Sequence, residues 1–435
     1  MQRFWELAYS WCALPLFWAL IRIFGLFNAK IRKGIRSRRG MFAQIAQSVA
    51  ALPPGPRIWF HSSSLGEFEQ AKPIIAELKR RMPGARIIVS FFSPSGYEHS
   101  RTYHLADVIT YLPFDTHRAA RRYLDLIRPD VAVMVRYDIW PNHIWELRRR
   151  SIPILIANAT MRRSTKRRMP LIRTFHRYVY DSINEILTVS AGDVESFKLF
   201  GLRRPAILAI GDTRFDQVSI RSVDARKRNI IAPSVLQGRQ VFVVGSSWPE
   251  DDAVVLPSML ELQQSFRRLL TILVPHEPTV DHLEDLEASL DGKTTSIRFS
   301  ALNEYGGEKV IIIDSVGILF TLYHYAQIAY VGGSFRQGIH NVLEAAVFGV
   351  PVLFGPRHRN AHEPLMLVER GGGFVINNGP ELTRTLRNLL EDDMARARAG
   401  ECAAQFVQAN IGATERFLSH LQPYLDTAAR ETITI

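Results

Sequence analysis

Three stretches of this sequence carry side chains that can move protons or bind anions. They are HSSSLGE at 61–67, GGSFRQGIHNVLE at 332–344 and PVLFGPRHRNAHE at 351–363. The first ends in a carboxylate, Glu67, and a positioned carboxylate can accept a proton from a hydroxyl group. The other two combine glycines with amide, basic and imidazole groups, which suit phosphate and other polar ligands. The residue types therefore favour proton transfer and anion binding.

Glu67 has two interpretations at this point. It lies between a short apolar run, 57–60, and a stretch with apolar residues at helical spacing, 71–78. An acidic residue in the first turn of a helix stabilises the free N–H groups and complements the dipole. A carboxylate at the carboxyl end of a strand can equally serve as a catalytic base. The local sequence leaves both interpretations open.

The stretch 332–344 reads as a glycine turn followed by a helix. Gly332 and Gly333 allow tight turning and close approach of the backbone. We expect Asn341 to cap a helix that begins at Val342, with Glu344 in its first turn. The helix N–H groups then face a phosphate, and the carboxylate accepts hydrogen bonds from ribose hydroxyls. A purely structural turn is the alternative here, and a solvated loop is the alternative for 351–363.

The elements that must position these residues are strands and helices in alternation. This alternation predicts βαβ units and two parallel, doubly wound sheets, with ligands at the carboxyl ends of the strands. The segment 216–239 has no strong strand and is the predicted linker. The apolar runs read as strands are 57–60, 86–92, 107–112, 130–135, 153–157, 185–189 and 206–210, then 240–245, 270–274, 309–313, 327–331, 351–354 and 373–376.

Length and composition describe a folded protein of two domains. The chain has 435 residues, of which 47% are hydrophobic and 22% charged. Its two cysteines, Cys12 and Cys402, stand at opposite ends of the chain. They form neither a disulfide framework nor a metal motif, which indicates a reducing compartment. HExxH and GxxxxGK[ST] are absent, which disfavours zincin and P-loop chemistry.

The net charge of +12 implies an anionic partner. Residues 30–39 hold six basic side chains, and a second basic cluster lies at 162–168. Neither cluster interleaves aromatic residues as a single-strand groove does, and no helix-turn-helix or RRM signature is present. The pattern favours a membrane surface or a phosphorylated substrate over nucleic acid.

The N-terminus holds an apolar segment, 4–29, whose core at 11–29 is interrupted only by Arg22 and Asn28. It is long enough to span a bilayer core of ~30 Å, although Arg22 at the centre costs ~2.5–3.5 kcal/mol. An interfacial helix and a buried core helix are the alternatives. The basic residues follow the apolar run, which argues against a cleaved signal peptide. They also predict that the remaining chain is cytoplasmic.

Several longer motifs resemble those of 3-deoxy-D-manno-octulosonic acid (Kdo) transferases, which add Kdo to a lipid A precursor. The resemblance runs from the N-terminus to about residue 400. Its motifs are HSSSLGE with the helix after it, FFSPSGYE at 91–98, GDTRFD at 211–216, GSSWPEDD at 245–252 and YVGGSFRQGIHNVLEAAVFGVPVLFGP at 330–356.

The resemblance implies a GT-B glycosyltransferase of the α/β class, with two Rossmann-like domains facing a cleft and an N-terminal membrane-anchor helix. It implies CMP-Kdo as donor, a lipid A precursor as acceptor, net inversion, and neither metal nor other cofactor. The expected location is the cytoplasmic face of the inner membrane. The expected parts are 1–40 (anchor and basic flank), 41–215 (acceptor domain), 216–239 (linker), 240–400 (donor domain) and 401–435 (C-terminal helical segment).

The resemblance also assigns roles to individual residues. Glu67 matches the family's proton acceptor, and Asp138, before Trp140 and Pro141, matches a second carboxylate that is one methylene longer in the family. Arg214 replaces a family lysine, which retains charge but not shape. The residues that match CMP-binding positions are Pro275, His276, Val316, Gly317, Ile318, Asn341, Val342, Leu343 and Glu344.

Some positions depart from the family pattern and keep other interpretations open. Arg136 stands where the family has Glu, His276 where it has Arg, and 316–318 lacks a carboxylate. A non-catalytic protein that binds a nucleotide sugar or lipid A is therefore the alternative function. Structural alternatives also exist for single residues: Asp138 as a cap of the helix 142–150, and Arg214 in an ion pair with Asp212 or Asp216.

Overall fold

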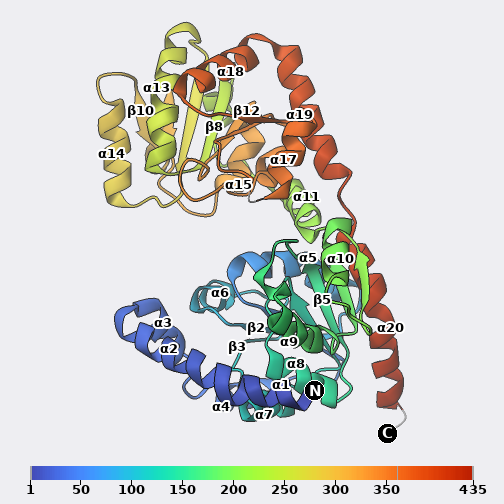
Figure 1. The fold of residues 1–435 in the computed structure, drawn as a ribbon. Coiled ribbons are helices and arrows are strands. Elements are labelled where there is room, and N and C mark those ends of the chain that lie inside the picture. Colours follow the sequence, from blue (N-terminus) through green and yellow to red (C-terminus); the bar gives the residue numbers. More distant parts are fainter. Residues whose placement is uncertain (1, 360, 434–435) are drawn as a thin grey trace. The chain divides into compact units, whose positions relative to one another are not determined.

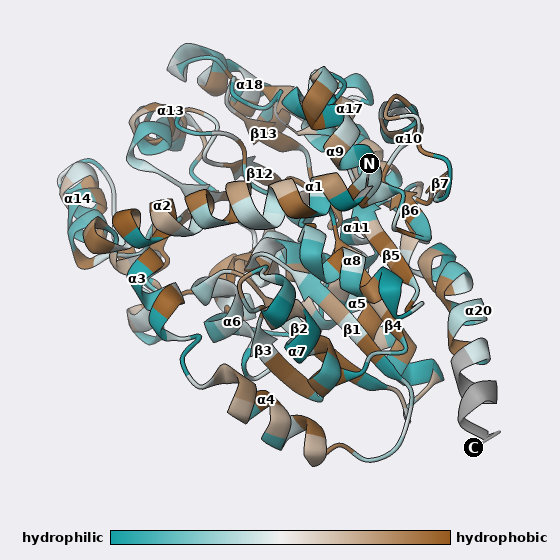
Figure 2. Ribbon diagram, turned by 60° about the horizontal axis from the view of Figure 1, so that its bottom comes forward, coloured by the Kyte–Doolittle hydropathy of each residue, from teal (hydrophilic) through white to brown (hydrophobic). Residues whose placement is uncertain are grey.

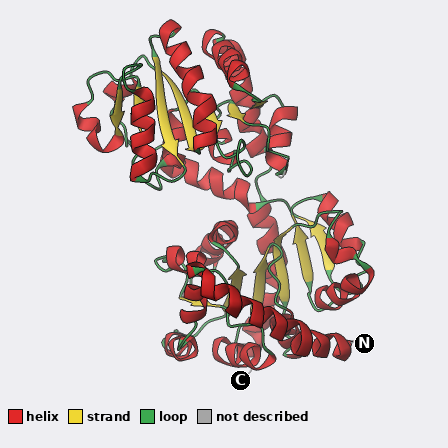
Figure 3. Ribbon diagram, turned by 60° about the vertical axis from the view of Figure 1, so that its left-hand side comes forward, coloured by secondary structure: helices red, strands yellow, loops and turns green. Residues whose placement is uncertain are grey.

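The computed structural model describes residues 2–359 and 361–433, which form two compact units (Figure 1). Unit 1 holds the chain up to Gln217 together with the residues from Gly412 onward, and unit 2 holds Val218–Ile411. The chain therefore passes from one unit to the other twice. Each unit contains one parallel sheet, and helices cover both faces of each sheet (Figure 3). The predicted α/β class with two doubly wound sheets is confirmed.

Unit 1 is built on a seven-stranded sheet in the order β3-β2-β1-β4-β5-β6-β7. Its strands are β1 (Arg57–Ser62), β2 (Arg86–Phe91), β3 (Val108–Tyr111), β4 (Val131–Val135), β5 (Ile154–Ala159), β6 (Glu185–Thr188) and β7 (Ala206–Ala209). Its helices are α4 (Met41–Ala50), α5 (Leu65–Arg81), α6 (Pro94–Ser100), α7 (His117–Ile127), α8 (Pro141–Arg149), η2 (Lys166–Arg168), α9 (Pro170–Tyr180), α10 (Ala191–Lys198) and α20 (Ala413–Ile433).

The alternation of side chains along each strand builds two cores, one on each face of this sheet. In β1, Ile58 and Phe60 face the core that α5 covers, whereas Trp59 faces the opposite core. All three side chains are fully buried. A strand buried on both faces explains why the sequence shows a continuous apolar run there.

Unit 2 repeats this architecture with the strand order β10-β11-β9-β8-β12-β13-β14. Its strands are β8 (Gln240–Ser247), β9 (Leu269–Pro275), β10 (Ser296–Arg298), β11 (Val310–Ile312), β12 (Ile328–Val331), β13 (Val352–Phe354) and β14 (Gly373–Val375). Its helices are α12 (Pro233–Leu236), α13 (Pro249–Ser265), α14 (Val280–Leu290), η3 (Phe299–Glu304), α15 (Leu319–Leu322), η4 (Tyr323–Tyr325), α16 (Leu343–Ala346), α17 (His362–Glu369), α18 (Gly379–Glu391) and α19 (Asp393–Gln408). The short edge strand β10 was not predicted.

The two chain passages between the units are held on the unit 1 side by Asp216. This residue lies in α11 (Thr213–Ala225), a helix that covers the start of the predicted linker. Its carboxylate accepts hydrogen bonds from Gly412 N (2.6 Å) and from Thr414 N and Oγ1 (2.7 and 2.8 Å). The helix α20 then packs on unit 1, where Phe417 and Leu421 enter the same core as α5.

The apolar N-terminus forms a nearly continuous helix, α1 (Gln2–Ala8), η1 (Tyr9–Ala13) and α2 (Leu14–Phe27), followed by the basic helix α3 (Ala29–Arg36). It is the one helix among the described residues with the length and composition to cross a membrane. Its apolar residues are coloured brown along α1 and α2 in Figure 2. The exposed large ones are Phe4, Leu7, Trp11, Leu16, Phe17, Leu20, Ile23, Phe24, Leu26 and Phe27. A buried core helix is therefore wrong.

Candidate active site

The two carboxylates predicted in unit 1 lie at the carboxyl ends of adjacent strands. Glu67 stands in the first turn of α5, directly after β1, and Asp138 lies in the loop after β4. The strand β1 pairs with β2 on one side and β4 on the other, which is the switch point of this sheet. Doubly wound sheets bind ligands at this point, because the loops on the two sides diverge there.

Glu67 makes the hydrogen bonds of a helix cap. Its Oε2 accepts from the backbone N–H groups of Ser63 (2.7 Å) and Ser64 (3.0 Å), so neither bond uses Oε1. The side chain is buried, with 7% of its surface exposed. Burial is the main cause that raises its pKa, and the negative charge of Asp138 adds to it, while the two N–H donors and His61 oppose the shift. The capping interpretation is confirmed as geometry, and the catalytic one stays a prediction.

Asp138 does not cap α8, because Trp140 occupies the N-cap position of that helix. Instead its Oδ2 contacts His61 Nε2 at 2.8 Å and accepts from Trp140 Nε1 at 3.3 Å. Burial pushes the pKa of Asp138 upward, but the hydrogen bond and charge of His61 outweigh it, so the net pKa is lowered. The structural alternative for Asp138 is therefore wrong.

His61 is held in place from its other ring nitrogen. The register of β1 and β2 sets His61 opposite Ser90, and His61 Nδ1 lies 2.8 Å from Ser90 Oγ. The same hydroxyl accepts from Trp59 Nε1 at 2.8 Å. Because the indole only donates, the Ser90 hydroxyl stays available to Nδ1, and Nε2 faces Asp138. This chain of contacts fixes the orientation of the Asp138 carboxylate.

The environment thus shifts the pKa values of these two neighbouring carboxylates in opposite directions. Asp138 is kept ionised, and its charge helps to raise the pKa of Glu67. Paired groups whose pKa values move apart are typical of acid and base roles in active sites.

Arg214 forms the ion pair that its structural alternative predicted. Its Nε and Nη2 donate to Asp212 Oδ2 at 2.9 and 2.6 Å, and its backbone N donates to Asp212 Oδ1 at 2.9 Å. Asp212 itself is buried, with 3% of its surface exposed. This ion pair is local, because the two residues are only two positions apart at the start of α11.

In unit 2, three rings from the carboxyl ends of adjacent strands form a stack. Trp248 follows β8, His276 follows β9, and His340 lies beyond β12. The ring centroids are 4.6 Å apart for Trp248 and His276 and 4.4 Å apart for His276 and His340. Trp248 Nε1 also donates to His340 Nε2 at 3.1 Å. Burial, and then the neighbouring His276, lower the pKa of His340 to about 4, so this imidazole is neutral at physiological pH.

The glycine turn after β12 is held by Asp251 in the first turn of α13. Its carboxylate accepts from Gly333 N (2.8 Å), Trp248 N (3.0 Å) and Tyr330 Oη (2.8 Å). Gly333 adopts φ +92°, and a Cβ there would lie 2.6 Å from the carbonyl oxygen of Gly338. Only glycine satisfies both conditions without strain.

The predicted CMP-binding residues follow β9, β11 and β12, which lie close together in the sheet order. Asn341 Oδ1 accepts from Leu343 N at 3.2 Å, but α16 begins at Leu343, one residue later than predicted, and is only one turn long. Glu344 forms an ion pair with Arg221 at 3.5 Å. Val316 is 79% exposed, and Gly317 adopts φ +83° before Ile318 and α15. A single turn offers less to a phosphate than the predicted helix.

The third stretch, 351–363, is more structural than predicted. Its Gly355 N donates to Ser334 Oγ at 2.6 Å, and His358 is buried with Nδ1 3.1 Å from Gly355 O. Asn360 lies outside the described residues. The loop therefore supports the glycine turn after β12.

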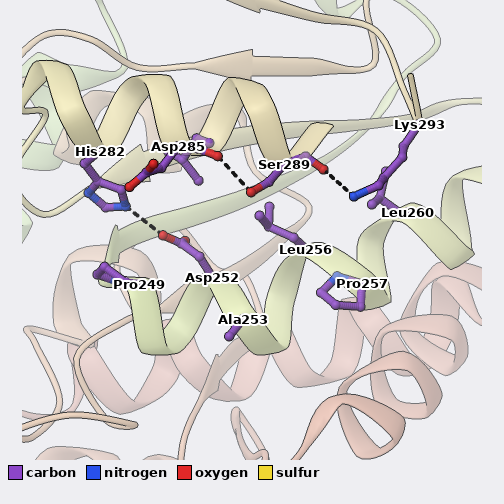
Figure 4. Close-up of a pocket in the computed structure, with 11 residues that line it drawn as sticks. Pro249, Asp252, Ala253, Leu256, Pro257, Leu260, His282, Asp285, Ser289 and Lys293 are labelled. Carbon is purple, nitrogen blue, oxygen red and sulfur yellow. Dashed lines mark hydrogen bonds and ion pairs between the residues drawn. The ribbon is translucent and has the colours of Figure 1, made fainter. Parts of the chain in front are cut away.

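A further hollow of about 360 Å³ lies between α13 and α14 in unit 2 (Figure 4). Asp252 contacts His282 Nε2 there at 2.8 Å, and this hydrogen bond raises the pKa of His282. None of the predicted site residues lines it. Across the described residues, no group of three or more His, Cys, Asp or Glu is arranged to hold a metal ion.

Sequence reasoning missed His61, Ser90, Trp248 and Asp251 as site residues. His61, Trp248 and Asp251 stand inside quoted motifs, so the signal was present but carried no role. Ser90 becomes visible only through the register of β1 and β2, and the role of Asp251 only through its contacts with the glycine turn.

In sequence, this chain is similar to known Kdo transferases. Residues 33–217 match the sequence family "3-Deoxy-D-manno-octulosonic-acid transferase (kdotransferase)". A 3-deoxy-D-manno-octulosonic acid transferase of Haemophilus influenzae is 27% identical over 434 residues, covering 98% of this chain and 99% of that protein. One from Aquifex aeolicus is 28% identical over 337 residues, 77% of this chain and 86% of that protein.

Among solved structures, the UDP-GlcNAc 2-epimerase from Neisseria meningitidis bound to UDP-GlcNAc is similar in fold. The TM-score is 0.60 at 14% identity, over 84% of this chain and 100% of that one. At this identity the likeness concerns the fold alone.

Proposed function

Because this chain belongs to the family of Kdo transferases, we propose that it transfers Kdo from CMP-Kdo to a hydroxyl group of a lipid A precursor. Family membership makes it a glycosyltransferase. The donor, the acceptor, the stereochemistry and the roles of single residues are parts of the proposal. The first three rest on the family resemblance, and the residue roles rest also on the geometry within each unit.

Glu67 is the general base of the proposed reaction. It accepts the proton of the acceptor hydroxyl as the oxygen attacks the anomeric carbon of Kdo, and the bond from that carbon to the phosphate breaks with inversion. CMP leaves with the electron pair. The observation that carries this role is the position of Glu67 at the switch point of unit 1, buried, with Oε1 outside the capping bonds and with a raised pKa. A raised pKa makes the carboxylate a stronger base than an exposed one.

Asp138 and His61 orient this site and keep a second negative charge beside Glu67. Arg214 acts through Asp212, because its guanidinium is engaged there in an ion pair. Its charge is therefore available to the reaction only if that pair opens on substrate binding. We place Arg214 among the positioning residues of α11.

The nucleotide is proposed to bind at the carboxyl ends of β11, β9 and β12 in unit 2. Asn341 and Glu344 supply an amide and a carboxylate, and His276 belongs to a stack of three rings. The carboxylate of Glu344 suits the ribose hydroxyls. Pro275, Val316, Gly317, Ile318, Val342 and Leu343 lie at or beyond these same strand ends and contribute backbone and apolar contacts.

The protein is proposed to work on the cytoplasmic face of a membrane. Large apolar side chains are exposed along α1 and α2, and α3 carries basic residues directly after them. The first part of this helix is tied to unit 1, since Tyr9 donates to Asp115 (2.8 Å) and Arg149 pairs with Glu6 (3.0 Å). A helix held along a folded domain suits the interface of a bilayer better than a free span.

The test compares Kdo transfer by the wild-type protein and by Glu67→Gln. Each protein is incubated with CMP-Kdo and a lipid A precursor, and the mass increase of the lipid is measured by mass spectrometry. The amide keeps the shape but cannot accept the proton, so we expect kcat to fall by roughly 10²- to 10⁴-fold with unchanged CMP affinity. Glu69→Gln, on the same helix and hydrogen-bonded to Gln217, is the matched control. Near-wild-type turnover by Glu67→Gln would contradict the assignment.

A non-catalytic binding protein is the second candidate, favoured by the capping bonds of Glu67. It predicts CMP binding by the wild-type protein with no mass increase in the lipid. A single product shifted by the mass of one Kdo residue excludes it.

A further inference from the structure

Arg136 is a cation at the edge of unit 1 that holds Glu67 and Asp138, and no anionic partner is found for it among the described residues. It directly follows β4, two residues before Asp138, and its backbone N donates to Ala157 O at 2.8 Å. It adopts φ +64°, in the left-handed region that residues other than glycine rarely occupy. Such backbone conformations persist where the surrounding structure imposes them, often at ligand sites.

The guanidinium of Arg136 is only partly solvated. Its Nε is buried without a hydrogen-bond partner, and no ion pair with an acidic residue is found for it in the described part of the chain. The neighbouring helix α8 shows the contrast, because Arg149 and Arg150 both pair with Glu146. A buried donor on a cation is costly unless it is paired, so an anion is expected to complete this site.

A second cation, Arg167, lies on the same exposed ring as Arg136. Tyr137 is 45% exposed, and the guanidinium carbons of Arg136 and Arg167 lie 5.7 and 5.9 Å from its ring centroid. Arg167 also donates to Tyr180 Oη at 3.1 Å. Burial, and then the charge of Arg167, lower the pKa of His176 to about 4. Arg167 belongs to the basic stretch 162–168 of the sequence.

We propose that Arg136 binds a phosphate group of the acceptor while its hydroxyl lies at Glu67. The inference rests on the proposed function, since it assigns the anion to a phosphorylated glycolipid. Arginine presents a planar fork of donors that matches phosphate oxygens, and a phosphate monoester carries more charge than a carboxylate. Arg136 is on the strand end beside Asp138, in the unit that holds the proposed base, whereas the nucleotide residues are in unit 2.

The test is steady-state kinetics of the full-length enzyme with Arg136→Met, Arg136→Lys and a matched control. Arg128→Met is that control, because Arg128 also adopts a positive φ (+43°) and precedes the other end of β4. We expect Arg136→Met to raise the KM for the lipid A precursor roughly 10- to 100-fold, the loss typical of a hydrogen bond to a charged group. The kcat and the KM for CMP-Kdo stay near wild type, Arg136→Lys is intermediate, and Arg128→Met behaves as wild type.

The acceptor is then compared before and after enzymatic removal of its phosphates. With dephosphorylated acceptor, wild type and Arg136→Met should have the same KM, because the group that Arg136 binds is gone. An unchanged KM of Arg136→Met for the phosphorylated acceptor overturns the proposal. A raised KM for CMP-Kdo in its place also overturns it, since the anion is then the donor's carboxylate.

A second arm does not depend on transfer. Inorganic phosphate, compared with chloride at equal ionic strength, should raise the melting temperature of wild type and Arg128→Met but not of Arg136→Met. If this difference is seen in a protein that transfers no Kdo, the anion site stands and the proposed function fails. If phosphate stabilises all three proteins equally, Arg136 is not the anion site.

Discussion

A small number of neighbouring groups sets the pKa of Glu67 in unit 1. Its pKa is raised by burial and by Asp138, and lowered by two backbone N–H groups and His61. Asp138 in turn is kept ionised by His61, which Ser90 orients. His61 therefore lowers the pKa of both carboxylates, whereas the charge of Asp138 raises the pKa of Glu67.

This arrangement predicts opposite pH shifts in two variants. The proposed reaction needs ionised Glu67, so kcat/KM should fall as the pH drops through the pKa of Glu67. Asp138→Asn removes a charge that raises this pKa, so the acidic limb of the residual activity should move to lower pH. His61→Gln removes a charge that lowers this pKa directly, so the limb should move to higher pH over the range in which Asp138 stays ionised. Profiles of kcat/KM against pH measure both, and shifts in the same direction would contradict the model of the site.

Glu344 is the carboxylate of unit 2 for which we propose a contact with the nucleotide. Its replacement in Glu344→Ala should weaken CMP binding roughly 10-fold or more, because an acceptor for the ribose hydroxyls is lost. Isothermal titration calorimetry with CMP measures the affinity. Glu381→Ala, at the start of α18 in the same unit, is the control and should bind as wild type. Equal affinities in all three proteins would leave Glu344 with its Arg221 ion pair as its only role.

At the scale of elements, α8 is the helix that holds Trp140 and Asp138 in place. Its N-terminus is capped from a distance by Asp115, which is fully buried. Asp115 accepts from Asn142 N (3.0 Å), His143 N (3.1 Å) and Tyr9 Oη (2.8 Å), and contacts His143 Nδ1 at 2.6 Å. The loop before α8 thus depends on a carboxylate that also binds the N-terminal helix.

Asp115→Ala should therefore destabilise unit 1 strongly. It leaves several buried donors unpaired, and each lost hydrogen bond to a charged group is worth about 1.5–3 kcal/mol. We expect the melting temperature of unit 1 to fall by several degrees, measured by calorimetry. Tyr9→Phe removes one of these bonds and should cost less. Asp125→Ala, a carboxylate 57% exposed on α7 and paired with Arg150, is the control and should change stability little. An Asp115→Ala protein as stable as this control would contradict the capping role.

At the scale of the whole molecule, the N-terminal helix has two faces with different partners. Tyr9 and Trp18 contact Asp115 and Phe114 of unit 1, at 2.8 Å and at a centroid distance of 4.2 Å. The other face exposes large apolar side chains. After α3, Arg38 donates to Leu112 O and Phe92 O and lies near three aromatic rings. Deleting the segment would therefore remove both membrane contacts and internal ones.

The membrane role is best tested by changing the exposed face alone. Serine at Leu16, Leu20, Ile23 and Phe24 should move the protein from the membrane pellet to the soluble fraction, because each exposed apolar side chain contributes to insertion. Activity should fall most with acceptor presented in vesicles and less with detergent-solubilised acceptor. Serine at Val280 and Met394, exposed on unit 2, is the control. Unchanged sedimentation of the α2 variant would contradict the membrane role.

The sequence alone determined the fold class and most strands. Residues such as 130–135 form apolar runs with only one stable solution, a strand buried on both faces of a parallel sheet. The same rules placed Glu67 at a strand end and Asn341 at the start of a helix, which begins one residue later than predicted. The edge strand β10 was not predicted, because three half-buried residues are too few to show a recognisable periodicity.

Only the tertiary structure decided which side chains act together. Asp138 contacts His61, and Asp115 caps α8, across long stretches of the chain. The lack of a partner for the Arg136 Nε among the described residues is likewise visible only in the folded unit. Local sequence carries propensity and burial, whereas hydrogen-bond partners and pKa shifts arise from strand order and register, which bring distant strand ends to one edge. For this reason the sequence could propose Glu67 as a base, but its protonation is set by neighbours that only the folded sheet supplies.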